Sequence, residues 1–419
     1  MTFRHLGDVL AEVEPLGQMF ADAGYRLYLV GGIVRDLWID EPLDAASDID
    51  LTTNALPADI KRLVSPVAEA LWSQGERFGT IGLRALGRDY EITTHRAESY
   101  ASDSRKPQVT FGDDIAIDLS RRDFTVNAMA IELPDGELVD PYGGAADLEA
   151  GVLRTPLSAE ISFSDDPLRM LRAARFGTKY SLDPVEELVA SAEQLHDRLR
   201  IVAIERICIE LRKLLDLPLA SQGLQFLTDA GLLTEVLSYG QESANERVVS
   251  RLAQAIDVAD RLPADWRLRL AGIGLTVYDD ADGVRALCRR LKLSREHERF
   301  VTHTSRSARS ALDAADTEPA TVRRWIAACN DIAAALQLAQ AVSPDGGAGG
   351  FVQAVNALVA TESMHKVSVL DGETIMKELA IAPGPVVGQA RAFLQDRCFE
   401  LGPLTSEDQL ELLRTWSQG

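Results

Sequence analysis

Two aspartates in the first quarter of the chain have a spacing that suits metal binding. Asp48 and Asp50 stand in the sequence SDIDL, where polar and apolar residues alternate as they do along a β-strand. Both carboxylates therefore project from one face of the predicted strand, while Ile49 and Leu51 enter the core. Paired carboxylates on one face hold two magnesium ions about 3.5 to 4 Å apart in enzymes that transfer phosphoryl or nucleotidyl groups. Alone, an Asp-x-Asp sequence is more often a solvated strand face.

A pair of glycines precedes these aspartates. Gly31 and Gly32 follow an apolar stretch that ends at Val30, and Arg35 comes shortly after them in a predicted helix. Glycines without a Cβ let backbone amides approach a ligand, and a helix that begins there offers free N–H groups. A triphosphate fits such a corner. Two glycines between a strand and a helix are otherwise a simple turn, so it is the combination with the arginine and the paired aspartates that indicates nucleotide chemistry.

A second cluster lies in the sequence RRDFTVNAM, which runs from Arg121 to Met129. Arg122, Asp123 and Asn127 stand just before a predicted strand. Guanidinium donors match phosphate oxygens in a bidentate fork, so this segment suits a clamp for sugar and phosphate groups. The alternative is a surface charge cluster beside a turn.

A third cluster lies on a predicted helix over residues 166–179. At 100° per residue its charged side chains form a stripe opposite the apolar ones, and no acid occurs between Pro167 and Leu182. The stripe consists of Asp166, Arg169, Arg172 and Arg175. Such an edge suits an anionic ligand that lies along the helix. Ser164 or Asp165 is expected to cap the N-terminus of this helix.

These clusters need a sheet that brings their strands together. The first 150 residues alternate helix and strand signals, which predicts a small mixed sheet with helices packed on it. The expected elements are a helix over 8–23, strands over 25–30 and 48–53, a short helix over 34–39, a helix after Pro57, and a hairpin of strands over 80–86 and 89–94. After about Pro156 apolar residues recur at helical spacing, so the rest of the chain is expected to be nearly all α. The fold class is thus α+β.

The chain of 419 residues carries a formal net charge of −21, which is acidic for a protein that binds nucleic acid. Residues 1–150 hold −14 of that charge, whereas residues 285–309 contain eight basic residues and two acids. This basic patch suits an RNA backbone or, equally, a surface helix with extended arginines. The four cysteines are too far apart for a zinc site or a disulfide framework. With no signal peptide and no membrane-spanning stretch in the sequence, a cytoplasmic location is expected.

The three clusters, in this order, resemble those of the class II tRNA nucleotidyltransferases, the bacterial CCA-adding enzymes, which are related to bacterial poly(A) polymerases. The resemblance covers about residues 20–215 and extends to a tail that contains Leu370-Asp371-Gly372 and Pro383–Gly388. It implies a seahorse-shaped arrangement of a nucleotidyltransferase head and an all-α neck, body and tail. The expected bounds are 1–155, 156–235, 236–342 and 351–419, with the glycine-rich stretch 343–350 as a linker.

The resemblance also implies roles for individual residues. Asp48 and Asp50 are expected to bind two Mg²⁺ ions, and Glu91 matches a third catalytic acidic position. The nucleotide-binding residues are expected to be Gly31, Gly32, Arg35, Arg122, Asp123, Asn127, Asp166, Arg169, Arg172 and Arg175. Asp166 and Arg169 would face the base. Cytosine and adenine both present an amine donor beside a ring-nitrogen acceptor, which suits a carboxylate and a guanidinium, whereas uracil and guanine reverse that order.

The implied reaction is the template-independent addition of CCA to the 3′ end of tRNA from CTP and ATP, with release of pyrophosphate. The alternatives are a CC-adding or A-adding enzyme, a poly(A) polymerase, and an RNA-binding relative without catalysis. Residues 99–107 resemble the loop that the final A addition needs, which argues against addition of C alone. Glu205, Arg206 and Glu210 resemble a further family motif and are interpreted as neck stabilisers. No membrane and no stable protein partner are implied.

Overall fold

The computed structural model describes residues 5–41, 48–85, 87–99, 108–239, 246–344, 346–362 and 369–417. The chain divides into two compact units, Met1–Gln241 and Glu242–Gly419, which are described separately. The predicted loop over residues 99–107 lies, apart from Ser99, outside the described residues. Part of the segment that joins Gly32 to Asp48 also lies outside them.

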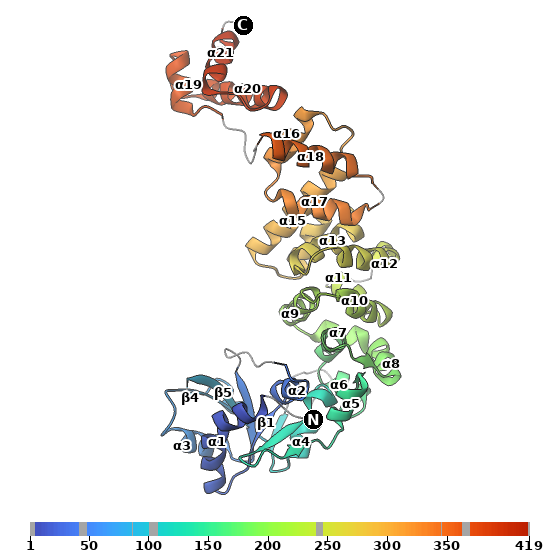
Figure 1. Ribbon diagram of the computed structural model, residues 1–419. Coiled ribbons are helices and arrows are strands. Elements are labelled where there is room, and N and C mark those ends of the chain that lie inside the picture. The colour runs from blue at the N-terminus through green and yellow to red at the C-terminus, as the bar shows by residue number, and fades with distance from the viewer. Residues whose placement is uncertain are drawn as a thin grey trace. The chain divides into compact units, whose positions relative to one another are not determined.

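The first unit is built on a mixed sheet of seven strands in the order β3-β4-β5-β2-β1-β8-β9 (Figure 1). Its strands are β1 (Leu27–Val30), β2 (Ile49–Thr53), β3 (Ala70–Trp72), β4 (Thr80–Ala85), β5 (Arg88–Thr94), β8 (Ala130–Leu133) and β9 (Leu138–Val139). Strands β2 and β5 pair in parallel, and the other neighbours pair antiparallel. The predicted small mixed sheet is therefore confirmed. Two short ladders accompany it, β6 (Arg96–Ser99) with β7 (Gln108–Phe111) and β10 (Val152–Leu153) with β11 (Asp183–Pro184).

Helices with an apolar stripe cover this sheet. In α1 (Leu6–Asp22) the residues Val9, Val13, Leu16 and Phe20 recur every three or four positions and are buried in one core with the strands. The other helices of this part are α2 (Gly32–Trp38), α3 (Pro57–Val64), η1 (Glu76–Phe78), α4 (Ile115–Ser120), η2 (Thr125–Asn127) and α5 (Gly144–Ala150). The core thus fixes the relative positions of β1 and β2.

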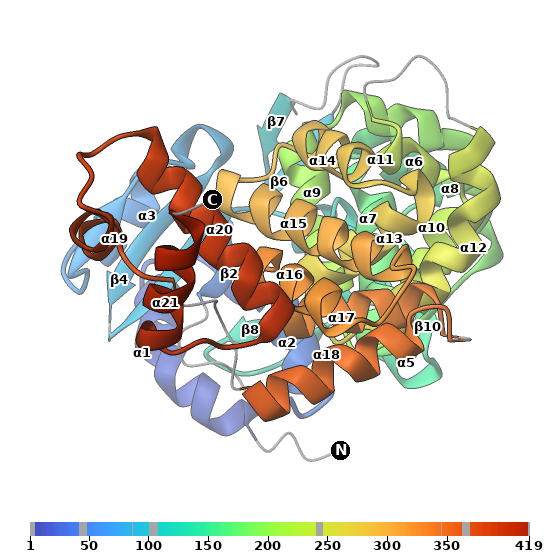
Figure 2. The same ribbon diagram turned by 90° about the horizontal axis from the view of Figure 1, so that it is seen from above.

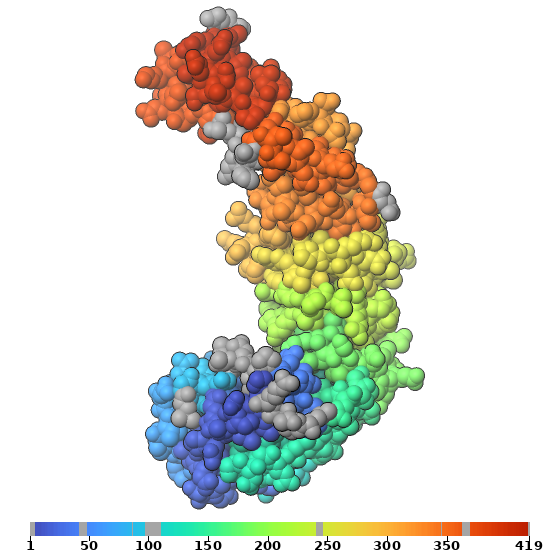
Figure 3. Space-filling model, in the orientation of Figure 1, coloured from blue at the N-terminus to red at the C-terminus, as the bar shows by residue number. Residues whose placement is uncertain are grey.

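The remainder of the first unit is helical, as predicted. Its helices are α6 (Ala159–Asp165), α7 (Leu168–Tyr180), α8 (Glu186–Leu195), η3 (His196–Ile201), α9 (Ile204–Leu215), α10 (Ala220–Asp229) and α11 (Leu232–Leu237). In the space-filling view, the teal residues of the sheet region and the green residues of these helices form one continuous mass (Figure 3). Helix α7 packs against both α9 and the β10–β11 ladder, and so links the two parts.

The second unit is helical throughout its described residues. Its helices are α12 (Glu246–Arg261), α13 (Trp266–Tyr278), α14 (Ala281–Arg290), α15 (Arg295–Leu312), α16 (Pro319–Ala328), α17 (Ile332–Val342), α18 (Gly349–Glu362), α19 (Gly372–Leu379), α20 (Pro385–Leu401) and α21 (Ser406–Trp416). One hydrophobic core runs from Val258 to Val355, so α18, which packs on α16, shares a core with α17 on the other side of the stretch expected as a linker. The proposed four-part division of the chain stays a prediction. Within the described ranges, no helix is both long and apolar enough to cross a bilayer.

Candidate nucleotide site

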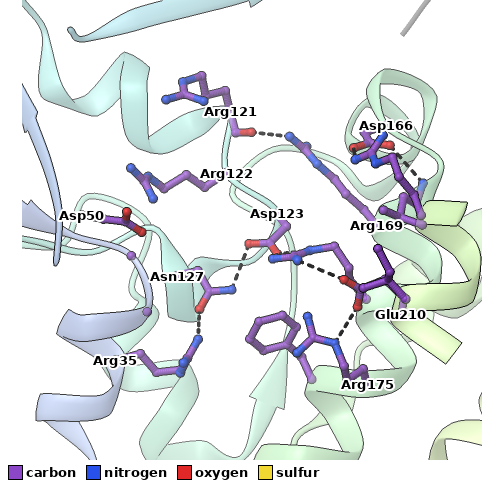
Figure 4. Close-up of a pocket in the computed structure, with 17 residues that line it drawn as sticks. Arg35, Asp50, Arg121, Arg122, Asp123, Asn127, Asp166, Arg169, Arg175 and Glu210 are labelled. Carbon is purple, nitrogen blue, oxygen red and sulfur yellow. Dashed lines mark hydrogen bonds and ion pairs between the residues drawn. The ribbon is translucent and has the colours of Figure 1, made fainter. Parts of the chain in front are cut away.

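A pocket of about 620 Å³ lies in the first unit, between the ends of β1 and β2, the segment before β8, and helices α7 and α9 (Figure 4). Eleven residues predicted from the sequence line it: Gly31, Gly32, Arg35, Asp50, Arg122, Asp123, Asn127, Asp166, Arg169, Arg172 and Arg175. Seven arginines and four carboxylates lie on its walls. The three sequence clusters, separated by up to 144 positions, therefore meet at one positively charged cavity.

The turn between β1 and α2 depends on glycine. Gly31 has φ 80° and ψ −133°, a conformation that L side chains rarely adopt. A Cβ at this position would lie 2.9 Å from Nη1 of Arg122. The bare backbone therefore lets the arginine and any ligand beside it approach the N-terminus of α2.

A chain of hydrogen bonds crosses the floor of the pocket. Arg35, which is 5% exposed, donates to Oδ1 of Asn127, whose amide donates to Oδ1 of Asp123 at 2.9 Å. Oδ2 of Asp123 accepts from Nε of Arg172 at 2.8 Å. Burial disfavours the Asp123 carboxylate, but Arg172 and Asn127 outweigh it and lower the pKa of Asp123 to about 2. This carboxylate is therefore charged at neutral pH and holds Arg172 in place.

Helix α9 contributes two side chains that the sequence interpretation did not place at the site. Glu210 accepts from Nε of Arg175 at 2.6 Å and lies 3.6 Å from Nη1 of Arg172. Arg206, one turn earlier, donates to Oδ2 of Asp166 at 2.9 Å. Both residues line the pocket. Their interpretation as general neck stabilisers was therefore incomplete, because they hold the charged stripe of α7.

Helix α7 begins later than expected. Ser164 and Asp165 belong to α6, which Ser158 caps, so neither is the N-cap of α7. Asp166 lies between the two helices, and its Oδ1 accepts from the N–H of Leu168 at 3.1 Å. Arg169 donates to Oγ of Ser162 at 2.8 Å and to the carbonyl of Arg121. The two residues expected to face the base are thus both fixed in position by protein contacts.

Three carboxylates gather at the strand edge of the site. Asp50 on β2 pairs directly with Glu91 on β5, which places both side chains on one face of the sheet. Burial raises the pKa of Asp50. The positive charge of Arg122 lowers this pKa, and the negative charge of Asp48 raises it, but the net shift is upward. The pKa of Glu91 is raised by burial and then by Asp50 and Asp48. Asp48 and Glu91 stand beside the pocket, whereas Asp50 lines it.

These carboxylates fit magnesium. Their mutual repulsion is the environment that a divalent cation relieves, and oxygen is the ligand that Mg²⁺ prefers. Among the described residues, no three His, Cys, Asp or Glu side chains are grouped so as to enclose one ion. That agrees with the usual magnesium site, in which one or two carboxylates act together with water and substrate phosphates.

Arg122 lines the pocket with a guanidinium whose hydrogen bonds are incomplete among the described residues. Its Nη2 lies 3.5 Å from Asp118, a long contact, and its Nε is buried with no hydrogen-bond partner among the described residues. Burial lowers the pKa of the guanidinium, and Asp118 opposes that shift. In Figure 4 the side chain points toward the space beside Asp50. An anion bound there would supply the missing acceptors.

Comparison with known families supports the same chemistry. Residues 27–154 match the family described as Poly A polymerase head domain. Residues 183–242 match a second family, described as a probable RNA and SrmB-binding site of polymerase A.

Curated relatives extend the match over most of the chain. The CCA-adding enzyme of Levilactobacillus brevis is 35% identical over 277 residues, which cover 66% of this chain and 67% of the relative. The CCA-adding enzyme of Lactiplantibacillus plantarum is 31% identical over 387 residues, which cover 90% of this chain and 89% of the relative. The crystal structure of the Bacillus stearothermophilus CCA-adding enzyme in complex with CTP superposes with a TM-score of 0.75 at 25% identity, covering 100% of this chain and 98% of that one.

Proposed function

This chain belongs to the family of bacterial CCA-adding enzymes, and we propose that it adds CCA to the 3′ end of tRNA from CTP and ATP, releasing pyrophosphate. The observation that supports this most directly is that Asp50 and Arg122 line the same pocket, with the Arg122 side chain pointing toward Asp50 (Figure 4). Carboxylates that suit magnesium and an arginine that suits phosphate stand side by side there. The cytoplasmic location expected from the sequence stays a prediction.

The phosphate end of the nucleotide is assigned to the strand edge. Asp48 and Asp50 would hold Mg²⁺, with Glu91 beside them. When bound, magnesium would supply activation of the attacking hydroxyl and charge neutralisation on the leaving pyrophosphate. The chain's own residues bind and orient the substrate: Gly31 and Gly32 offer backbone at the start of α2, and Arg122 offers unpaired donors to the phosphate oxygens. Arg35, held by Asn127, supports this wall.

The base end is assigned to α7. Asp166 accepts from the amine of cytosine or adenine, and Arg169 donates to the adjacent ring nitrogen. Uracil or guanine would set a carbonyl oxygen against the carboxylate, and a mismatched contact of this kind costs about 1 to 3 kcal/mol. One pair of side chains therefore accepts C and A while it rejects U and G. Arg172 and Arg175 complete the positive wall, each tied to a carboxylate of the protein.

A product-length assay tests the proposal. The protein is incubated with magnesium, CTP, ATP and a tRNA that lacks its terminal CCA, and the products are resolved by length. Addition of three nucleotides ending in A is expected. Two added C residues would select the CC-adding alternative, a single A the A-adding one, and a long A tract the poly(A) polymerase. Binding of tRNA without extension would select the non-catalytic relative.

The metal assignment has its own test. Asp48→Ala is expected to abolish nucleotide incorporation while tRNA binding stays within about twofold of the parent, because the aspartate is placed at the reacting phosphates and not on an RNA-binding surface. Asp59→Ala in α3 makes the same charge change beside Arg62, away from the pocket, and should leave incorporation intact. Normal extension by the Asp48 variant would overturn the assignment.

A further inference from the structure

An exposed tryptophan stands in line with the carboxylates on the outer face of the sheet. Trp72 on β3 pairs with Gly82 on β4, and Gly82 pairs with Glu91 on β5. Glu91 in turn pairs with Asp50 on β2. Directly paired residues project from the same face of a sheet, so these positions form one row across adjacent strands. We refer to them as the cross-strand row.

The glycine in the middle of the row lets the indole lie against β4. A Cβ at Gly82 would overlap Nε1 and Cε2 of Trp72, so the ring fills the place of a side chain there. Gly82 is buried as a result, whereas Trp72 remains 36% exposed. Neighbouring strands lie about 4.8 Å apart, so this aromatic surface over β4 lies about 10 Å from β2 and its Asp50. An apolar surface is thus held at a fixed place beside the carboxylates.

The polar groups on either side of the row are paired with one another. On one side Arg84 binds Asp89 through two contacts of 2.6 and 2.8 Å. On the other side the hydroxyls of Thr80 and Thr93 lie 2.9 Å apart. These residues occupy the next positions of β4 and β5 on the same face of the sheet. The middle of the face is therefore where an outside group meets exposed apolar surface, at the indole of Trp72.

The geometry of the proposed reaction determines which group approaches the row. In nucleotidyl transfer the attacking hydroxyl and the leaving pyrophosphate lie roughly in line, on opposite sides of the phosphorus. The proposed function places the triphosphate at the start of α2, which follows β1, and β1 and β5 flank β2 on opposite sides. Figure 2 shows that β4 lies on the opposite side of β2 from α7, where the base of the incoming nucleotide is assigned. The RNA that supplies the hydroxyl therefore reaches Asp50 from the β5 side, along the cross-strand row.

We propose that Trp72 stacks on the 3′-terminal base of the acceptor RNA and so holds its 3′ hydroxyl beside Asp50 and Glu91. The inference rests on the proposed function, in which the terminal base of the acceptor changes as nucleotides are added. Stacking on an aromatic ring suits such a substrate, because every base has a π-face and no hydrogen bond reads its edge. Selection of the incoming base then rests with α7, while Trp72 positions each successive acceptor end in the same way.

Substitutions at Trp72 separate stacking from a role in the sheet. Trp72→Leu keeps an apolar side chain over Gly82 but removes the aromatic surface, and Trp72→Phe retains a smaller ring. Leu71→Ala is the matched control, since Leu71 is an exposed apolar residue of the same strand that pairs with Leu83 on the opposite face. Each protein is tested with two RNA minihelices that lack CCA and differ only in a normal or an abasic 3′-terminal nucleotide. The affinity for each RNA, the KM for each RNA and the KM for CTP are measured.

Trp72→Leu is expected to raise both the KM and the dissociation constant for the normal RNA about tenfold, the effect of losing one base–aromatic stack. The abasic RNA has no terminal base to stack, so the same variant should change its values by less than about twofold. Trp72→Phe and the Leu71→Ala control should stay within about threefold of the parent. An equal KM for CTP in every protein shows that the nucleotide site remains folded.

Two results would overturn the inference. One is an equal loss for the normal and the abasic RNA in Trp72→Leu, which would assign the tryptophan to the stability of β3 alone. The other needs no variant: it is a parent protein that binds and extends the two RNAs equally well. A parent that extends neither RNA with magnesium, CTP and ATP would instead contradict the proposed function itself, and the inference with it.

Discussion

Asp123 lies at the centre of the pocket's hydrogen-bond chain, and its replacement by Asn tests whether that chain stabilises the site. The change preserves shape but removes the negative charge that faces Arg172. The carboxylate has a pKa of about 2 in place of its usual 3.8, and a difference of this size corresponds to about 2 kcal/mol of stability at pH 7. Asp123 is only 9% exposed, so solvent screens the pair little.

The expected result is a free energy of unfolding about 2 to 3 kcal/mol lower in Asp123→Asn at pH 7, because Arg172 also loses a partner. Urea unfolding followed by circular dichroism measures it, with one transition allowed for each unit. Asp89→Asn is the control. Asp89 forms a two-point ion pair with Arg84 at 2.6 and 2.8 Å on the surface, and its replacement is expected to change stability little because solvent screens it.

The stability that the Asp123 carboxylate contributes should decrease as the pH is lowered. The folded pKa of Asp123 is depressed, so its contribution is complete above the unfolded value near 4 and is lost as the pH falls toward 2. The stability difference between the parent and Asp123→Asn should therefore shrink between pH 4 and pH 2. Equal effects of Asp123→Asn and Asp89→Asn at pH 7, or a difference that does not diminish in acid, would refute the reasoning.

Three further substitutions follow from the same contacts. Arg206→Ala frees the Asp166 carboxylate, and the preference for CTP over UTP, measured as a ratio of kcat/KM values, should fall about tenfold if positioning of that carboxylate supplies about 1.4 kcal/mol of discrimination. Glu210→Gln leaves Arg175 and Arg172 without their shared acid, and the unfolding free energy should fall by about 3 kcal/mol; an unchanged urea midpoint would contradict this. Gly31→Ala places a Cβ 2.9 Å from Arg122 in a strained conformation, and should cost about 1 to 3 kcal/mol and weaken CTP binding, whereas Gly7→Ala, with open space around it, should do neither.

Local patterns predicted much of the fold because the central strands are short, largely apolar runs, buried along their whole length in β1 and for most of it in β2 and β4. The strands over 25–30, 48–53, 80–86 and 89–94 appear within two residues of their expected bounds. Strand β3 was not predicted, since all three of its side chains are exposed and show no alternation. The parallel pairing of β2 with β5 is a contact between distant segments, and periodicity within one strand says nothing about its neighbour. That pairing is what sets Glu91 opposite Asp50.

The site was predictable where chemistry was concentrated in short motifs, and not where it depended on contacts between helices. Arg206 and Glu210 lie on a helix whose Ile207 and Leu211 form an ordinary core face, so these two charged residues were interpreted as neck stabilisers. The sequence nevertheless contained a pattern from which the buried ion pair of Glu210 could have been predicted. Glu210 lies about 60° from Ile207 on the helix wheel, at the border of the buried face, where an acid needs a partner. The partner proved to be an arginine 35 positions earlier.

The two ends of the pocket differ in how far their charges are already satisfied. On the α7 side, Arg172 and Arg175 are each bound to a carboxylate and Asp166 is bound to an arginine, so these charges are already paired within the protein. On the strand side, Nε of Arg122 has no hydrogen-bond partner among the described residues, and burial and Asp48 raise the pKa of Asp50 although Arg122 lowers it. A magnesium–triphosphate complex supplies an anion and a cation at once. Under the proposed assignment, the base would therefore meet side chains that are already paired within the protein, whereas the triphosphate and its magnesium would meet charges that are less fully paired.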